Sequence, residues 1–189
     1  MTMKNYLIVA VILVGCGQAM GQYNSLTLSG GYAFNNIEQA DVSGSGFRIN
    51  GLYEYHPIVG KFVHGFSVGY VSTSAEVTEF SGGQQIDSKY TINSWPFYYA
   101  PKLLIGEGSL KGFIKGAIGM QFSTLKRSGT LSDVKTNDAG FYGGLGAGVL
   151  KDINDKISLN LEYEWAYSSN SYYRDGFLNS VMLGVGIKL

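Results

Sequence analysis

Glu162 and Glu164 are the residues whose type and spacing most directly suggest chemistry. They stand two positions apart in the chain, so in a β-strand both side chains lie on one face. Two neighbouring carboxylates can serve as general acid and general base. Neighbouring basic residues of the same inner face, such as Arg48, explain the same carboxylates more simply as ion-pair partners. Nothing else in the sequence supports catalysis, and we expect no enzymatic activity.

Other reactive groups are few. The two histidines, His56 and His64, lie at or next to one short turn-like segment, Tyr55–Gly60. A serine hydrolase needs a base beside its serine, and no histidine lies in the segments that we assign below to the opposite end of the molecule. The glycine run Gly143–Gly148 has no helix-forming segment after it, unlike a nucleotide-binding loop. We expect no cofactor and no metal ion.

The N-terminus has the order of a secretory signal peptide. A short start carrying Lys4 is followed by the apolar run Tyr6–Val14 and then by the small-residue stretch Gly15–Gly21. The apolar run is too short to span a membrane as a helix. We expect residues 1–21 to be a signal peptide and residues 22–189 to be one exported domain.

Cys16 leaves a second interpretation of this segment open. Leu13–Cys16 resembles a lipobox, after which the cysteine would carry a lipid. Ordinary cleavage after Gly21 is favoured, because the first expected strand begins only a few residues later and leaves little tether. The mature chain then contains no cysteine, which excludes disulfides and cysteine metal sites.

The composition is unusual for a soluble globular domain. The 14 basic and 14 acidic residues give a formal net charge of zero, so nothing suggests a nucleic-acid partner. Charged residues make up 15% and aromatic residues 14% of the chain, whereas soluble domains contain about a quarter charged residues. A protein with a lipid-facing band and a polar interior would have this profile.

The mature chain shows alternation with a period of two and no helical periodicity. In Ile157–Tyr167, apolar residues alternate with Ser, Asn, Glu and Ala, which is typical of a strand with two different faces. Each such segment has about the length that a tilted strand needs to cross a bilayer. The eight segments are Leu26–Phe34, Phe47–Tyr55, Phe62–Tyr70, Trp95–Leu103, Ile114–Phe122, Phe141–Val149, Ile157–Tyr167 and Val181–Leu189.

Three features indicate that the apolar face points outward, into lipid. Short connections (56–61, 105–109, 151–155) alternate with long ones (35–45, 73–89, 123–139, 168–176), as in outer-membrane barrels. Aromatic residues gather near the ends beside the long connections, where an interface would favour them. The other face is rich in Gly, Ala and Ser, which fit a narrow lumen. The alternative is a secreted, soluble lipocalin-like barrel that binds a small apolar ligand inside.

We therefore predict an all-β fold, an eight-stranded antiparallel up-and-down transmembrane β-barrel in the bacterial outer membrane. Because a sheet edge in lipid leaves costly unpaired amides, the first and last segments must pair. Both termini then lie on the periplasmic side, and four long loops face outward. We expect a monomer.

Charged residues on the inner face predict two interior clusters. The first joins Arg48 to Glu162 or Glu164, and the second joins Glu54 to Lys102 or Lys115. Charged side chains in a narrow lumen need partners, because removing one member of an ion pair leaves the other buried without a counter-charge. We interpret this network as structural, with a narrow conducting pore as the alternative.

The whole mature chain resembles the OmpX/OmpA-type eight-stranded outer-membrane barrels. The resemblance rests on strand number, loop asymmetry and the C-terminal strand Val181–Leu189. Such strands usually end in an aromatic residue that the barrel-assembly machinery recognises, and here the last residue is Leu189. The resemblance implies an outer-membrane lipid environment and contact with that machinery. It also implies a role in envelope integrity, adhesion or surface contact, with a surface ligand bound through the loops.

Overall fold

The fold is a single ring of antiparallel strands. A computed structural model describes residues 23–38, 40–57, 60–81, 84–129 and 134–189, and the expected signal peptide and Cys16 lie outside them. No helix among these residues is long and apolar enough to cross a membrane. The strands are β1 (Tyr23–Ile37), β2 (Val42–His56), β3 (Phe62–Ser81), β4 (Gln84–Tyr99), β5 (Lys102–Ile105), β6 (Leu110–Gly129), β7 (Val134–Asp152), β8 (Ile157–Ser168) and β9 (Tyr173–Lys188).

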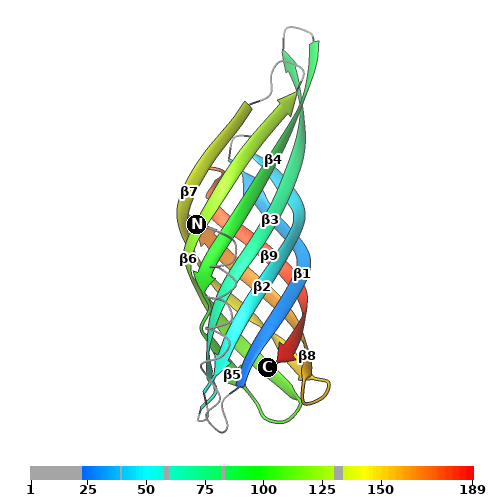
Figure 1. Cartoon of the computed structure of the whole chain (residues 1–189). Helices are drawn as coiled ribbons and strands as arrows, with labels where there is room; N and C mark the ends of the chain where they lie inside the picture. Colours follow the sequence, from blue (N-terminus) through cyan, green and yellow to red (C-terminus); the bar gives the residue numbers. More distant parts are fainter. Residues whose placement is uncertain (1–22, 39, 58–59, 82–83, 130–133) are drawn as a thin grey trace, which may run out of the picture.

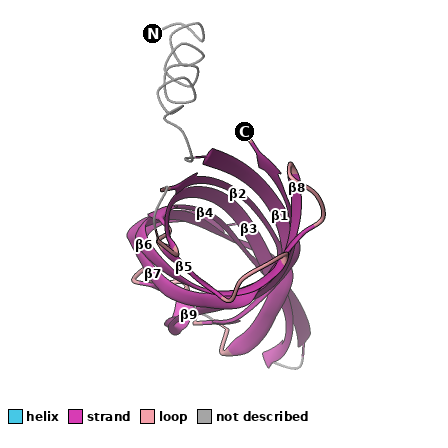
Figure 2. Ribbon diagram, turned by 90° about the horizontal axis from the view of Figure 1, so that it is seen from below, coloured by secondary structure: helices cyan, strands magenta, loops and turns pink. Residues whose placement is uncertain are grey.

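The ring is closed by the first and last strands. β1 pairs with β2 on one side and with β9 on the other, in register from Ser25 opposite Lys188 to Asn35 opposite Leu178. The remaining strands pair with their neighbours around the ring, and the view along the axis shows the resulting barrel (Figure 2). The predicted antiparallel up-and-down closure is confirmed.

The nine strands occupy eight positions in the ring. β4 and β5 are two parts of the fourth position, since both pair with β3 and with β6. The break falls at Ala100 and Pro101, where proline has no N–H to donate to the ladder. Ala100 N still donates to Gly65 O over 2.7 Å, and Gly116 N donates to Pro101 O over 2.8 Å. The fourth strand is thus interrupted without opening the barrel.

The apolar faces of the strands point outward. Leu159, Leu161 and Val185 are 39%, 50% and 49% exposed, whereas Glu162 and Lys115 are 4% and 1% exposed. A soluble ligand-binding barrel has the reverse arrangement. The predicted orientation, with hydrocarbon-facing side chains outside and charged side chains enclosed, is confirmed.

The prediction of four long loops is wrong. The strands instead continue into paired hairpins at the end opposite the C-terminus: β3 runs to Ser81, and β6 runs to Gly129. The hairpin of β3 and β4 extends farthest from the barrel (Figure 1). Cross-strand pairs hold it together beyond the membrane, among them Lys89 Nζ with Glu76 Oε1 at 3.0 Å.

Candidate functional site: the barrel interior and the outer rim

Glu164 is the centre of the interior at mid-height. Its carboxylate forms an ion pair with Arg48 over 2.7 Å and another with Lys115 over 2.6 Å, and all three side chains are buried. It also accepts a hydrogen bond from the Tyr142 hydroxyl. These partners come from β2, β6 and β7, while Glu164 lies on β8. The carboxylate therefore ties together four strands around the lumen.

Arg48 extends the same network across the lumen. Its guanidinium donates to Ser180 Oγ over 3.0 Å and to the Tyr98 hydroxyl over 2.9 Å. The rings of Tyr98 and Tyr142 face each other with centroids 5.1 Å apart. With β4 and β9 included, six strands contribute side chains to one connected group.

Lys115 reaches its carboxylates because of a glycine. Lys115 pairs with Gly146 on β7, and Gly146 pairs with Glu164 on β8. Since glycine has no side chain, Lys115 crosses β7 and contacts both Glu164 and Glu162. A Cβ at position 146 would lie 3.2 Å from Glu162 Oε1 and 3.3 Å from Lys115 Cε. The glycine-rich stretch of β7 makes room for the ion pairs.

A second charged group lies nearer the short turns. Lys102 of β5 forms an ion pair with Glu54 of β2, and both are buried. The Lys102 Nζ also lies 4.7 Å from the centroid of the Phe113 ring. His56 stacks on Tyr23, with ring centroids 4.1 Å apart, so it has a structural contact in the rim.

The sequence placed six charged residues in the interior, and the structure buries all of them. Of the alternatives left open, Arg48 contacts Glu164, and Glu54 contacts Lys102. Lys115 lies with the two glutamates of β8 and not with Glu54.

Sequence reasoning missed the tyrosines of the network. Tyr98 and Tyr142 are buried against the charged groups. The signal for them was present, because each is a large ring on an otherwise small or polar strand face.

The outward half of the lumen is closed by uncharged side chains. Tyr173 of β9 hydrogen-bonds through its hydroxyl with Ser94 Oγ over 2.7 Å, and Gln121 donates to the same hydroxyl over 3.3 Å. Above them an apolar cluster fills the space, with Tyr172 from the β8–β9 connection folded into it. Its buried members are Ala33, Ile37, Val71, Ala75, Tyr90, Ile92, Leu125, Tyr172, Tyr173 and Leu178.

Among the described residues, no group of three or more His, Cys, Asp or Glu side chains is placed to hold a metal ion. The interior groups are instead paired with one another. Their chemistry is that of ion pairs and hydrogen bonds inside a closed ring.

The closed antiparallel ring, the apolar outer face and the charged, glycine-lined interior define an integral membrane β-barrel of the bacterial outer-membrane class. The sequence matches the outer membrane protein beta-barrel domain over residues 7–188, and the chain belongs to that family. The protein is therefore an outer-membrane protein that lies in membrane lipid.

Solved structures show the same fold. Ail, the attachment invasion locus protein of Yersinia pestis, aligns with a TM-score of 0.53 and 19% identity over 88% of this chain and 99% of Ail. Neisserial surface protein A aligns with a TM-score of 0.53 and 15% identity over 92% and 100% of the two chains. A major outer membrane protein from Thermus thermophilus aligns with a TM-score of 0.54 and 10% identity over 89% of this chain and 99% of that protein. No curated protein sequence matches the chain.

Proposed function

We propose that the protein is a non-enzymatic, non-conducting barrel that serves as a membrane scaffold and uses its outward hairpins for contacts at the cell surface. The observation that carries this proposal is the connected interior. At mid-height, Arg48, Glu164 and Lys115 join strands on all sides of the lumen. Above them, Tyr172 and Tyr173 close it with apolar contacts. A narrow pore would need a continuous path of water past both levels.

The hairpins supply the surface for contact. Two outward-facing aromatic residues, Tyr70 and Trp95, have the character of an interfacial girdle. Four strands continue well beyond them: β3, β4, β6 and β7. Arg174 at the start of β9 forms an ion pair with Asp41 in the β1–β2 connection, so two hairpin ends are tied together. Ail has been solved with the heparin analogue sucrose octasulfate. That case supports surface binding as a use of this architecture.

Planar-bilayer recording tests the non-conducting part. Purified protein that shows the mobility shift between unboiled and boiled samples in SDS is folded, and we expect it to give no steady unitary steps at moderate voltage. A general porin in the same bilayer is the positive control. Well-defined single-channel steps from the folded protein would overturn the scaffold assignment in favour of a pore.

Whole-cell binding tests the surface part. In the trimmed variant, residues 76–89 are replaced by an Asn-Gly turn that joins Ala75 to Tyr90, which are register partners. Cells displaying the intact protein should adhere to immobilised host-type glycans or matrix proteins more than cells displaying the trimmed variant at equal surface level. Equal adhesion to every surface would count against this hairpin as the contact element.

The proposal also covers cleavage of the signal peptide, recognition of the last strand during assembly, and the oligomeric state. Removal of residues 1–21 would leave Gln22 as the first residue, and mass spectrometry of the mature N-terminus distinguishes this from a lipid on Cys16. We propose that β9 is recognised by the barrel-assembly machinery although it ends in Leu189, and that the barrel is a monomer. Crosslinking during assembly and light scattering of the purified protein test these two points.

A further inference from the structure

Outward-facing residues of four neighbouring strands form rows at defined heights near the outer rim. One row, on β3, β4, β6 and β7, is polar and linked by hydrogen bonds, with Ser72 donating to Asn93 over 2.9 Å and Thr124 donating to Asn137 over 2.8 Å. The register aligns the four residues as Ser72, Asn93, Thr124 and Asn137. Below this row come aromatic residues such as Trp95 and Phe122, so the row marks the change from hydrocarbon to headgroups.

The next row outward contains two lysines directly opposite each other. Lys126 of β6 pairs in register with Lys135 of β7, and both are exposed. Like charges in this position repel. Among the residues that the structure describes, two nearby acidic groups are engaged elsewhere, since Glu76 holds Lys89 and Asp138 accepts from Ser171. The two lysines therefore form a concentrated positive site above the girdle that an anion would stabilise.

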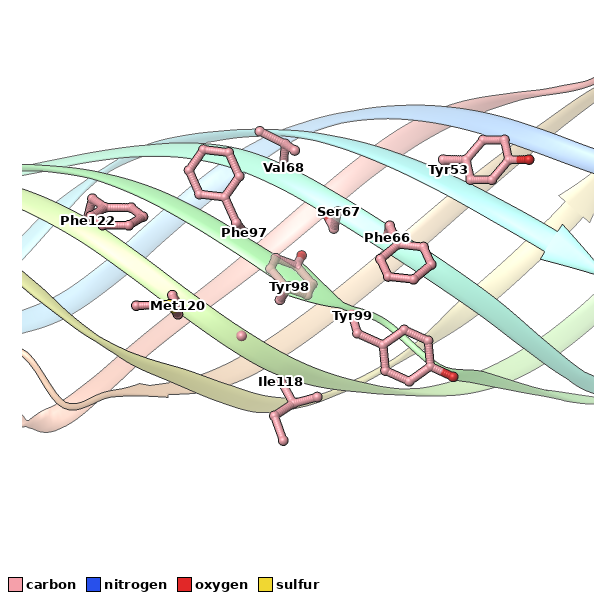
Figure 3. Close-up of a pocket in the computed structure, with 11 residues that line it drawn as sticks. Tyr53, Phe66, Ser67, Val68, Phe97, Tyr98, Tyr99, Ile118, Met120 and Phe122 are labelled. Atoms are coloured by element: carbon pink, nitrogen blue, oxygen red, sulfur yellow. The ribbon is translucent and has the colours of Figure 1, made fainter. Parts of the chain in front are cut away.

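An apolar groove lies on the same face, lower in the membrane. It has a volume of about 880 Å³ and opens on the outer surface of β3, β4 and β6. Phe97 and Phe122 lie on one side of it and Phe66 and Tyr99 on the other (Figure 3). Groove, girdle and lysines are continuous, because a second hollow shares Phe122 with the groove and a third shares Trp95 with the second and reaches Lys126 and Lys135.

The dimensions fit one lipid molecule. Lys126 lies eight residues beyond Ile118 along β6, which is about 26 Å of strand and about 18 Å of height at a 45° tilt. One leaflet of hydrocarbon is about 15 Å thick. A lipid with its headgroup at the lysines would therefore place an acyl chain along the groove.

We propose that this face is a specific site for an outer-leaflet lipid whose headgroup carries a phosphate monoester. The phosphate lies between Lys126 and Lys135, whose combined charge matches the charge of about −1.5 to −2 on a phosphate monoester near neutral pH. The lysine stems extend over the polar row while their ammonium groups reach the phosphate. One acyl chain packs along the groove between Phe97 and Phe66. The site adds a selected lipid to the general bilayer contact of the barrel.

Tryptophan quenching by brominated lipids tests the site directly. The chain has two tryptophans, so Trp165→Phe leaves Trp95 beside the site, and Trp95→Phe leaves Trp165 on β8. In phosphatidylcholine vesicles we compare a few mole per cent of chain-brominated phosphatidic acid with the same amount of chain-brominated phosphatidylcholine. Both lipids carry bromine on the acyl chain, so the depth of the tryptophan in the membrane affects both quenching values equally. Trp95 should show a preference of about tenfold for phosphatidic acid, and Trp165 should show a ratio near one.

Charge variants distinguish the lysine pair from a general attraction. Lys126→Gln combined with Lys135→Gln should bring the Trp95 ratio down to that of Trp165. The matched control, Lys151→Gln with Lys156→Gln, removes the same charge near the short turns and should leave the ratio unchanged. A ratio of one in the parent protein, or an equal loss in both double variants, would overturn the proposal.

A groove variant tests the acyl-chain part. Val68→Phe fills the groove and should reduce quenching of Trp95 by the phosphatidic acid chain, whereas Val181→Phe on the outward face of β9 should not. Unchanged quenching in Val68→Phe would show that the lysines act on headgroups alone and would overturn the groove as part of the site. The mobility shift in SDS confirms that every variant compared is folded.

Discussion

Glu164 receives two cations and a tyrosine hydroxyl in a part of the barrel where none of them meets solvent. The network is stable only while positive and negative groups balance. A buried pair is not in itself a large source of stability, but a buried charge left without its partner is costly. The stability of the barrel at mid-height therefore depends on the negative charge of Glu164, which both cations share, more than on any one of its ion pairs or hydrogen bonds.

Replacing this carboxylate should be among the most damaging changes in the chain. We expect Glu164→Gln to lower the free energy of unfolding by about 3–5 kcal/mol, because Arg48 and Lys115 lose their shared counter-charge. Urea unfolding of the protein in lipid vesicles measures the change. Glu76→Gln, which breaks the exposed pair with Lys89, is the control and should have little measurable effect. Equal results for the two variants would mean that water reaches the lumen freely.

The outward face has the opposite requirement. Leu161 lies on the lipid side of β8, so Leu161→Arg should destabilise the barrel by about 2–4 kcal/mol if the residue lies near the bilayer midplane. Ile153→Arg, in the turn between β7 and β8, is the control, since an arginine there reaches water. The same urea titration compares them. A negligible effect at Leu161 would place it outside the hydrocarbon.

At the scale of the strands, sequence patterns predicted those parts that lie inside the bilayer and failed beyond it. Between Leu26 and Phe34 one face meets lipid and the other meets the lumen, so the residue types must alternate. The hairpin of β3 and β4 continues past the part of the barrel whose two faces meet lipid and lumen, and the alternation disappears although pairing continues through contacts such as Thr78 with Asp87. Alternation of residue types indicates that the two faces of a strand meet different environments, and it does not indicate the strand itself. The sequence therefore suggested a loop where β3 and β4 continue as paired strands.

The interior was predictable in its members and not in its pairing. Period two placed Lys115 and both β8 glutamates on the inner face, but the choice of partner depends on register. Lys115, Gly146 and Glu164 fall in one row across three strands. The stagger of a closed barrel sets that row, and no single strand sequence contains it.

The β3–β4 hairpin should be separable from the barrel. Replacing residues 76–89 with an Asn-Gly turn keeps the register partners Ala75 and Tyr90. It removes exposed pairs such as Glu76 with Lys89, which contribute little stability. We expect the trimmed protein to keep its mobility shift in SDS and to unfold within about 1 kcal/mol of the parent. Loss of the shift would show that the hairpin guides folding.

For the whole molecule, the decisive contact is the seam between β1 and β9, because without it two edges face hydrocarbon. Gly31 lies in that seam opposite Met182. A Cβ at Gly31 would overlap the Val181 carbonyl oxygen, whereas a Cβ at the neighbouring Gly30 would have its nearest neighbouring atom at 3.9 Å. The structure therefore has no space for a side chain at Gly31, whereas it has space for a methyl group at the adjacent Gly30.

Gly31→Ala should weaken closure of the ring, because the backbone of β9 would have to move away from β1. Overpacking of this kind costs about 1–3 kcal/mol, and a lost seam hydrogen bond in lipid adds to it. The expected result is a smaller folded fraction in unboiled SDS samples and a lower urea midpoint. Gly30→Ala introduces the same methyl group one residue away and should fold like the parent. If both variants closed equally well, the seam would be able to adjust its spacing, and its tight approach at Gly31 would not be required for the barrel.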